Sequence, residues 1–459
     1  MPKGNEFHIR DIPGAHTESG CALRLATYIA ELSGHDFDID TNDAIYRCVL
    51  DAVCSAASAL AQPGVKAAQR AAPILFGQGS SSLWFTERTA SVGGALLANS
   101  AATAALDLDD GFRIARGHPG AAVIPTALAL MQSTEGATIS DFMAAVVAGY
   151  EIGVRLAAAR PAYAPSGAWS GFAVVATASR LLHLRPEVIA QALAIVVQTS
   201  PALPALAGIA GSDVKEGIPS GVVAGWTALR LAMEGFSGPI GVLDDPRLFH
   251  SQTLLRNLDG VPLIKGTYFK PFGCCRHIHA PLEALLHLQA LHGFTASDVV
   301  GVEVFTYQAT FNLTNKPRPA TLVEAQYSVP YCLALCLLHG ADSLVPLDTA
   351  HLSDRQIGDL AERITVSHDT AIEPLFPARS PARVTVTLAG GRQLSSPLMD
   401  PRGDPDRPMS WTDLEAKLIV ATRSTLSPSH QQAVLDGVTS LRNGDMAPLQ
   451  RTLAMPGGR

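Results

Sequence analysis

The sequence predicts an α plus α+β protein, in which a large all-helical domain precedes a smaller α+β domain. From Ala22 to about residue 255, apolar residues recur at helical spacing, and no alternating strand pattern appears. After LIKGTYFKPFGCCRHIHA the period changes, and DVVGVEVFTYQATF follows, a segment rich in β-branched and aromatic residues. We therefore expect a helical domain over 21–262 and an α+β domain over 263–400.

Length and composition limit the possible functions. The 459 residues are enough for two or three domains, and 47% hydrophobic with 16% charged residues is typical of a folded, soluble protein. A net charge of −7 without an arginine-rich run argues against nucleic-acid and anionic-membrane partners. Seven widely spread cysteines, an odd number, fit reduced thiols and a cytoplasmic location.

Two segments bear on targeting and membrane association. Residues 1–20 are rich in Gly, Pro and His without an apolar signal-peptide core, so we expect a loose leader. The longest uncharged run, Val188–Ser212, is long enough to cross a membrane. Because it contains Gln191, Gln198 and prolines, we expect two buried helix pieces joined by a turn.

The remaining elements follow from periodicity and turn residues. Helices of the first domain are expected over 22–60, 66–76, 90–108, 121–133, 139–159, 172–183, 186–199 and 220–234. The second domain should contain helices over 281–292 and 325–338, the strand RITVSHD and a hairpin at Gly390–Gly391. Residues 401–459 begin with a polar linker, and their helices, 411–425 and 428–441, are expected to pack back on the first domain.

The densest cluster of charged residues is ALDLDDGFRIARGHPGA, residues 105–121. It places Asp107, Asp109, Asp110 and His118 between two nearly uncharged helical segments. Asp107 and Asp110 are three residues apart and would share a helical face, and Gly111 would end that helix. One interpretation is a helix end with solvated acids and a capping histidine. The other is an active site, because acids between buried helices must be paired or functional.

A second cluster, FKPFGCCRHIH, contains Lys270, Arg276, His277 and His279 around the Cys274–Cys275 pair. Zinc binding is disfavoured because adjacent cysteines cannot easily both ligate one tetrahedral ion. The alternatives are structural packing, or a rigid turn that presents cations to an anionic substrate with a histidine as acid or base.

Two isolated residues are weaker candidates. Tyr331, in YSVPY, would lie in the first turn of a helix that begins at Pro330. Lys215 is the only cation in a long apolar region and fits a surface or an active-site lysine equally well. Dinucleotide-binding, Walker, H-E-x-x-H and C-x-x-C motifs are absent from the sequence, which leaves cofactor-free acid–base chemistry open.

Together these motifs resemble the MmgE/PrpD family, which includes 2-methylcitrate dehydratase, cis-aconitate decarboxylase and iminodisuccinate epimerase. The matching segments, in the family's order, are LDLDD…GHPG, GYEIGVRL, GFSGP, KPFGCCRHIHAPLEAL and AQYSVPYCLALCLLHG. The resemblance implies an active-site cleft between a helical and an α+β domain. It also implies a homodimer that needs neither a metal nor an organic cofactor.

The resemblance extends to single residues. Asp107 matches the first acid of the family's D-x-D/N-D motif, His118 the histidine of H-P, and Lys270 and His279 the ends of the K-P…H string. Tyr331 matches the helix tyrosine near the cleft, and Lys215 falls within one position of the family's lysine. Three departures are Gly111 in place of Thr or Ser, Ala164 in place of a histidine, and KEGIPSG without the histidine of K-x-x-H-x-G.

The family's common step, moving a proton on a carbon next to a carboxylate, sets our expectation for function. The leading hypothesis is a cofactor-independent hydro-lyase of the 2-methylcitrate dehydratase kind, acting on a small polycarboxylate. The alternatives are an epimerase, isomerase or decarboxylase on a related acid, and a binding protein that has lost catalysis. We expect catalytic roles for His118, Asp107, His279, Tyr331 and Lys215, and substrate binding by Lys270, Arg276, His277, Asp110 and Cys275.

Overall fold

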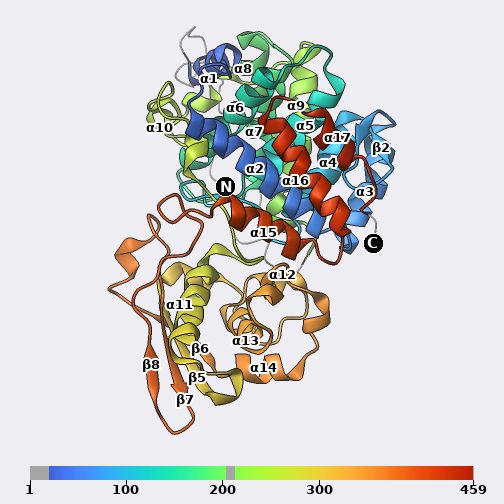
Figure 1. Ribbon diagram of the computed structural model, residues 1–459. Helices are drawn as coiled ribbons and strands as arrows, with labels where there is room; N and C mark the ends of the chain where they lie inside the picture. Colours follow the sequence, from blue (N-terminus) through green and yellow to red (C-terminus); the bar gives the residue numbers. More distant parts are fainter. Residues whose placement is uncertain (1–19, 203–211, 458–459) are drawn as a thin grey trace, which may run out of the picture.

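The computed structural model describes residues 20–202 and 212–457, which form two domains. A larger, mostly helical domain lies above a smaller domain with a four-stranded sheet (Figure 1), so the predicted fold class is confirmed. The expected leader and the second half of the uncharged run fall largely outside the described residues.

The helical domain is built around three almost completely buried helices, α5, α6 and α7. Thr138 is the N-cap residue of α6 and forms a capping box. The ion pair expected on this helix between Glu151 and Arg155 is present, with 2.6 Å between Oε1 and Nη2. The domain's helices are α1 (Cys21–Glu31), α2 (Ile39–Ser58), α3 (Pro63–Phe76), α4 (Val92–Ala104), α5 (Gly120–Ser133), α6 (Ile139–Ala158), α7 (Gly167–Leu181), α8 (Pro186–Thr199), α9 (Ile218–Met233) and α10 (Ser251–Leu255).

The smaller domain places helices against a mixed sheet of order β6-β5-β7-β8. Strand β5 (Val299–Thr306) pairs in parallel with β6 (Ile364–His368) and antiparallel with β7 (Arg383–Leu388), which forms a hairpin with β8 (Gln393–Ser395). The hairpin predicted at Gly390–Gly391 is confirmed. The helices are α11 (Arg276–His292), α12 (Leu322–Gln326), α13 (Val329–His339) and α14 (Arg355–Ala361).

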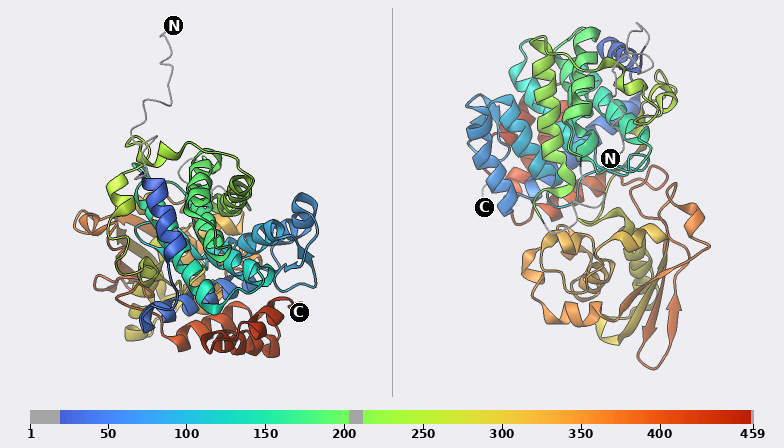
Figure 2. Two further views of the ribbon diagram at one scale, coloured as in Figure 1. Left: turned by 90° about the horizontal axis from the view of Figure 1, so that it is seen from above. Right: turned by 180° about the vertical axis from the view of Figure 1, so that it is seen from behind.

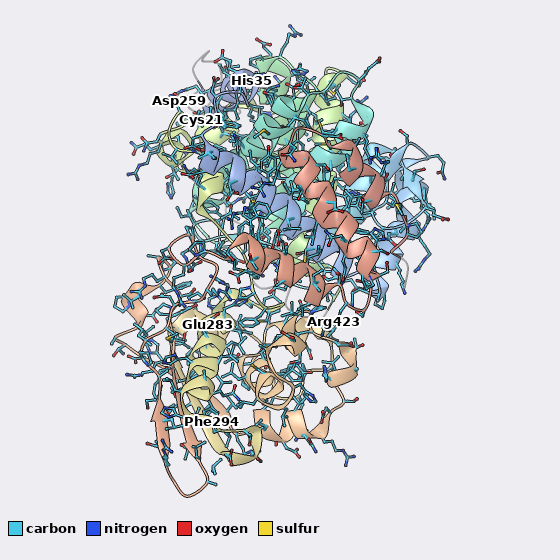
Figure 3. The ribbon with its side chains drawn as sticks, in the orientation of Figure 1. Cys21, His35, Asp259, Glu283, Phe294 and Arg423 are labelled. Carbon is cyan, nitrogen blue, oxygen red and sulfur yellow. The ribbon has the colours of Figure 1, made fainter. Side chains whose placement is uncertain are left out.

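The C-terminal helices lie on the helical domain, not on the sheet. Helices α15 (Trp411–Ala421) and α16 (Pro428–Arg442) contact α2, and α17 (Ala447–Leu453) packs on α16 (Figures 1 and 2). Just after α15, Arg423 lies at the boundary between the domains (Figure 3), where its Nη2 donates to the Asp342 carbonyl at 3.2 Å.

The structure contains two pairs of short strands that the sequence did not predict. Strand β1 (Ser81–Ser82) pairs antiparallel with the nearby β2 (Thr89–Ala90), and β3 (Gly111–Phe112) pairs antiparallel with the distant β4 (Thr267–Tyr268). The β3–β4 pair brings the acidic cluster, residues 105–121, next to the cationic cluster, residues 269–279. Within the residues that the structure describes, no single helix is long and apolar enough to span a membrane; one bent pair, α2 with α3, passes that test by length and composition.

Candidate active site

A cavity of about 190 Å³ lies between the two domains and is lined by residues of both. Its helical-domain wall comes from the α4–α5 and α6–α7 loops and from the turn before α9. Its other wall comes from the start of α11 and the loops around β5. Sites for drug-sized ligands typically measure roughly 300–1,000 Å³, so this cavity fits a small molecule.

Asp107 is the anionic centre of the cavity wall. Its Oδ1 accepts from Nζ of Lys215 at 2.5 Å and lies 3.1 Å from Nζ of Lys270, which also donates to the Asp107 carbonyl at 2.9 Å. Burial alone would raise the pKa of Asp107, but the two ammonium groups and His118 hold it well below its usual range. The backbone of Asp107 is left-handed, with φ +52°. Such a conformation is costly for a non-glycine residue and is often found at functional sites.

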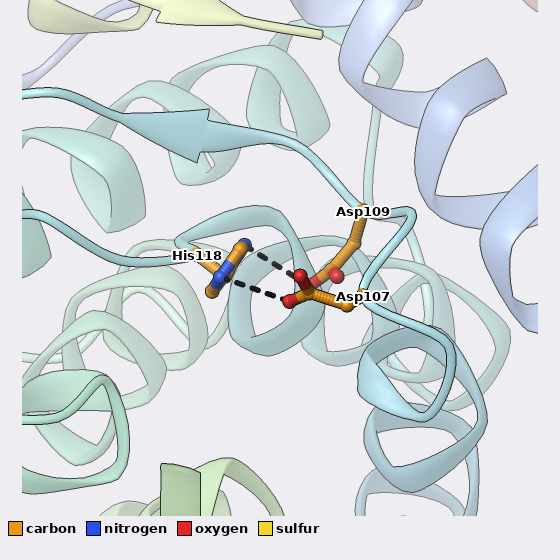
Figure 4. Close-up of side chains that lie close together, drawn as sticks. All are labelled: Asp107, Asp109 and His118. Carbon is orange, nitrogen blue, oxygen red and sulfur yellow. Dashed lines mark ion pairs between the residues drawn. The ribbon is translucent and has the colours of Figure 1, made fainter. Parts of the chain in front are cut away.

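His118 presents one ring nitrogen to the cavity. Its Nδ1 lies 2.6 Å from the Asp110 carbonyl, which can only accept, so Nδ1 carries a proton and Nε2 is the nitrogen that can take up or release a second proton. Nε2 lies 3.6 Å from Oδ1 of Asp107, and Nδ1 lies 3.7 Å from Oδ2 of Asp109 (Figure 4). Nε2 also lies 3.7 Å from Oε1 of Glu216. The imidazole is therefore surrounded by three carboxylates, which stabilise positive charge on the ring.

Lys215 and Glu216 approach the cavity from a strained turn before α9. Their φ angles are +39° and +49°, and both side chains are buried. Lys215 also donates to the Tyr327 hydroxyl at 2.6 Å. One carboxylate oxygen of Glu216 accepts from Ser166 Oγ at 2.6 Å, and the other lies 3.3 Å from the Tyr327 hydroxyl. Burial alone would raise the pKa of Glu216, but His118 and Lys215 lower it, which favours the carboxylate.

Asp110 lies behind this wall rather than in it. It accepts from the Tyr150 hydroxyl at 2.5 Å and from the backbone N–H of Gly120, at the start of α5, at 3.0 Å. Burial and the nearby carboxylate of Asp51 raise the pKa of Asp110 to about 8, so its carboxyl group is mostly protonated at neutral pH. Its backbone carbonyl orients His118, while its side chain fixes the loop to α5 and α6.

The expected shared helical face of Asp107 and Asp110 is wrong. Helix α4 ends at Ala104, four residues before the expected helix end at residue 108. The motif then continues as a turn into β3. The left-handed backbone at Asp107 rotates its side chain toward the cavity, whereas Asp110 points into the helical core. Helical spacing therefore does not describe this loop.

Comparison with known proteins connects this geometry to a family. The model of the MmgE/PrpD N-terminal domain matches residues 23–257, and that of the MmgE/PrpD C-terminal domain matches residues 272–443. The chain belongs to the MmgE/PrpD family. Two curated relatives are cis-aconitate decarboxylases of Aspergillus terreus, 25% (strain NIH 2624 / FGSC A1156) and 24% identical over 402 residues. Each alignment covers 79% of this chain and 81% of the relative.

Membership in the MmgE/PrpD family makes this chain an enzyme of the lyase and decarboxylase kind. Of the residues expected at the site, six line the cavity: Asp107, His118, Lys270, Cys275, Arg276 and His277. Lys215, whose placement was open, is 2% exposed and paired with Asp107.

His279 and Tyr331 do not line the cavity. Nε2 of His279 lies 3.0 Å from the Cys274 carbonyl, and its Nδ1 lies 3.3 Å from Nη1 of Arg276. His279 therefore helps to hold the Arg276 side chain in place. Burial and the neighbouring Arg276 lower the pKa of His279, which keeps the ring neutral. The hydroxyl of Tyr331 is buried without a hydrogen-bond partner in the described residues, whereas that of Tyr327 contacts Lys215.

Several cavity residues were missed by sequence reasoning. Glu216 follows Lys215 directly, so a second charge in that apolar region was the available signal. Tyr327 stands in the same YSVPY motif as Tyr331, and the helix expected over 325–338 is broken there into α12 and α13. Aromatic side chains that complete the wall gave no signal in the sequence: Tyr163, Tyr268, Tyr307 and Phe376.

Two remaining residues of the cationic cluster form part of the cavity wall without adding charge. Burial and the Arg113 guanidinium lower the pKa of His277 to about 4, and its ring lies against Tyr307, with 5.3 Å between centroids. Burial and Asp107 raise the pKa of the Cys275 thiol to about 12. Both side chains are therefore neutral at pH 7.

Asp107, Asp109 and His118 also have the spacing of metal ligands, with one candidate atom of each within 4.8 Å of the others (Figure 4). Two features disfavour a divalent cation. Asp107 already pairs with two ammonium groups, which would repel the ion, and Nδ1 of His118 donates to a carbonyl. This arrangement suits proton transfer better than metal ligation.

Proposed function

We propose that this MmgE/PrpD enzyme is a lyase that moves a proton on a carbon next to a carboxylate of a small polycarboxylate, with loss of water as the leading outcome. The observation that carries the proposal is the orientation of His118 at the cavity wall, where the bond from Nδ1 to the Asp110 carbonyl leaves Nε2 as the nitrogen for proton transfer. A neutral imidazole with one oriented, unprotonated nitrogen is suited to general-base catalysis.

In the proposed mechanism, Nε2 of His118 takes the proton from the carbon. The imidazolium that forms lies 3.6–3.7 Å from Asp107, Asp109 and Glu216, which stabilise its charge. The substrate carboxylate gains negative charge at the same moment. Lys215 and Lys270, already positioned by Asp107, are the cations available to stabilise it.

Loss of water requires a proton for the departing hydroxyl, and Tyr327 is the best-placed donor. Burial and the charges of Asp107 and Glu216 raise the pKa of Tyr327, so its hydroxyl is protonated. The neighbouring Lys215 ammonium, 2.6 Å away, stabilises the tyrosinate that forms after transfer. The C–O bond then breaks, its electron pair leaves with the hydroxyl as water, and the double bond forms.

Decarboxylation is the second candidate, and the names of the two Aspergillus relatives favour it. In that reaction a C–C bond breaks, CO₂ leaves, and the electron pair left on carbon is protonated by His118. An epimerase needs a second proton-transfer group on the opposite face of the substrate; His279 and Tyr331, which were expected for that role, do not line the cavity, so Tyr327 would have to serve. As proposed, both reactions use only side chains of this chain. The homodimer expected from the resemblance stays a prediction.

Proton NMR in D₂O with a panel of citrate-like and succinate-like acids tests the proposal. A vinyl signal indicates elimination, a vinyl signal with CO₂ release indicates decarboxylation, and deuterium uptake without an alkene indicates isomerisation. His118→Ala should lower the rate by roughly 10²–10⁴-fold. The matched control is His183→Ala, whose side chain is 59% exposed and lies away from the cavity.

Unchanged turnover in the His118→Ala variant would refute the mechanism. Binding of an acid by the wild-type protein with no exchange, alkene or CO₂ would instead support the hypothesis of a binding protein.

A further inference from the structure

A second charged cluster lines the cavity and is not used by the proposed proton transfer. Arg113 follows β3 in the helical domain, and Arg276 begins α11 in the smaller domain. The pairing of β3 with β4 brings them together across the ring of Tyr268, whose centroid lies 6.0 Å from the guanidinium carbon of Arg113 and 4.5 Å from that of Arg276. The two domains thus each contribute one arginine to the same part of the cavity.

One buried carboxylate, Asp404, connects the two guanidinium groups. Its Oδ1 lies 2.9 Å from Nη2 of Arg276, and its Oδ2 accepts from Nη2 of Arg113. Arg113 also donates to Ser380 Oγ at 2.9 Å, and Arg276 to the carbonyl of Arg402 at 2.9 Å. These bonds fix both side chains. In Arg276, Nη2 also donates to the Pro401 carbonyl at 3.4 Å and Nη1 contacts Nδ1 of His279, so Nε–H is the donor left for a ligand. Arg113, in contrast, keeps N–H groups on Nε and on both Nη atoms.

Asp404 belongs to the segment that the sequence suggested was only a polar linker. The backbone of Gly403 has φ +98°, and a Cβ there would lie 1.9 Å from the carbonyl oxygen of Phe269. That close approach allows the N–H of Phe269 to donate to the Gly403 carbonyl at 3.1 Å, next to Lys270. The linker is therefore packed against the segment that carries the cationic cluster, and it delivers Asp404 to the arginines.

The charge of this cluster is not balanced. One carboxylate between two guanidinium groups leaves one positive charge in a largely buried position. Arg276 is 8% exposed, and its Nε has no hydrogen-bond partner among the described residues, a costly state for a buried cationic donor. The exposed Arg116, over the ring of Tyr163 at 4.7 Å, adds a further positive charge to the cavity lining.

The lysines of the site are balanced by two carboxylates. Lys215 and Lys270 both lie on Oδ1 of Asp107, and the charge of Glu216 also acts on Lys215. Beyond the carboxylate at the reacting carbon, a further anionic group of a bound molecule therefore finds its unmatched partner at the arginines. Arginine presents N–H groups in a planar fork that matches a carboxylate.

We propose that Arg113 and Arg276, held side by side by Asp404, form a subsite for a substrate carboxylate other than the one at the reacting carbon. The inference rests on the proposed function for the identity of the reacting end, and it defines the substrate as an acid with at least one further carboxylate. Arg113 and Arg276 bind that group, and Asp404 is a positioning residue that sets their spacing.

The test compares two unreactive acids by calorimetric titration of the full-length protein. Tricarballylate carries three carboxylates, and methylsuccinate is the same skeleton without one terminal carboxylate. The wild type should bind tricarballylate at least about tenfold more tightly, as expected for one charge-assisted contact. Arg113→Met and Arg276→Met should remove most of this preference, and Arg113→Lys should restore it only in part.

Steady-state kinetics test the positioning role of Asp404. Asp404→Ala should raise KM for the turned-over acid by about tenfold with little change in kcat, and Asp404→Glu should recover part of the loss. The matched control is Arg318→Lys, an exposed arginine paired with Asp359 and Glu362 outside the cavity. Circular dichroism and thermal melts establish that each variant is folded.

Two results would overturn the inference: no wild-type preference for tricarballylate, or a preference that folded arginine variants retain. Repeating the titration in the His118→Ala protein separates it from the proposed function, because binding at the arginines does not require proton transfer. Loss of turnover with an intact preference leaves the subsite standing. Turnover without an arginine-dependent preference removes the subsite alone.

Discussion

Two tyrosines of one short motif have opposite surroundings. The hydroxyl of Tyr327 lies 2.6 Å from Nζ of Lys215 and lines the cavity, whereas that of Tyr331, in the first turn of α13, is buried without a partner in the described residues. The break between α12 and α13 explains the difference. Tyr327 lies in the break, before α13 begins, whereas Tyr331 lies on α13 and its side chain is buried with that helix.

Phenylalanine substitutions should therefore have different effects. Tyr327→Phe removes the proposed proton donor and should lower the turnover rate by about 10²-fold, the lower limit for loss of a general acid. Tyr331→Phe should leave the rate unchanged and keep or increase stability, since it removes a buried, unpaired hydroxyl. Steady-state kinetics and urea unfolding of both variants measure these effects. A large rate loss only in Tyr331→Phe would contradict the assignment.

Asp110 should make stability fall as pH rises. Burial and Asp51 raise its pKa to about 8, so the folded protein keeps this proton while the unfolded chain releases it near pH 4. The unfolded state then binds fewer protons, and this group lowers the free energy of unfolding by up to about 1.4 kcal/mol per pH unit between those values.

Asp110→Asn should remove this dependence, because an amide does not titrate; its oxygen can still accept from the Gly120 N–H, and its NH2 can donate to the Tyr150 oxygen in place of the bond that Asp110 accepts. Urea unfolding at intervals from pH 5 to pH 9 should show the variant gaining stability relative to the wild type up to about pH 8 and no further. A stability difference that does not vary with pH would rule out a protonated Asp110.

At the scale of elements, the two-residue pairing of β3 with β4 assembles the site. It aligns Gly111 with Tyr268 and so joins two motifs that lie about 160 positions apart. A Cβ at Gly111 would lie 2.3 Å from the Tyr268 ring. The departure from the Thr or Ser of the family pattern thus has a physical reason, since the ring that packs on Arg276 occupies that space.

Gly111→Thr should therefore destabilise the protein by about 1–3 kcal/mol, the usual cost of overpacking. Combining it with Tyr268→Ala should recover much of the loss relative to Tyr268→Ala alone. Gly301→Thr, in β5, is the control, because a Cβ there would meet only the Arg363 carbonyl at 3.5 Å. Urea unfolding of the four proteins gives the coupling energy, and simple additivity of the two changes would disprove the steric explanation.

The same pairing shows what sequence reasoning could and could not provide. Long periodic segments predicted the helices, and two segments dense in charge predicted Asp107, His118 and Lys270 as site residues. Sequence reasoning did not predict the turns. The left-handed backbone at Lys215 and Glu216 follows from tertiary packing and not from a local pattern, and so does the end of α4 at Ala104. Asp404 escaped for the same reason, because its partners are far away in the chain and its own segment resembles a linker.

At the scale of the whole molecule, the C-terminal helices support the acidic loop from behind. Lys417, on α15, is 5% exposed; its Nζ lies 2.5 Å from Oδ1 of Asp51 on α2 and donates to the Leu108 carbonyl at 2.8 Å. Leu108 separates Asp107 from Asp109. One side chain thus joins the last segment of the chain, the second helix and the loop at the cavity.

Lys417→Met should cost about 3–5 kcal/mol of stability, because it leaves the Asp51 carboxyl group buried without its partner. Lys417→Met with Asp51→Leu replaces the pair by apolar side chains and should recover most of that energy, since a buried ion pair is often no more stabilising than good packing. Turnover distinguishes a second effect. The double variant still lacks the donor to the Leu108 carbonyl, so its kcat should stay low although its stability returns, whereas full recovery of kcat would show that the C-terminal helices stabilise the fold without positioning the loop.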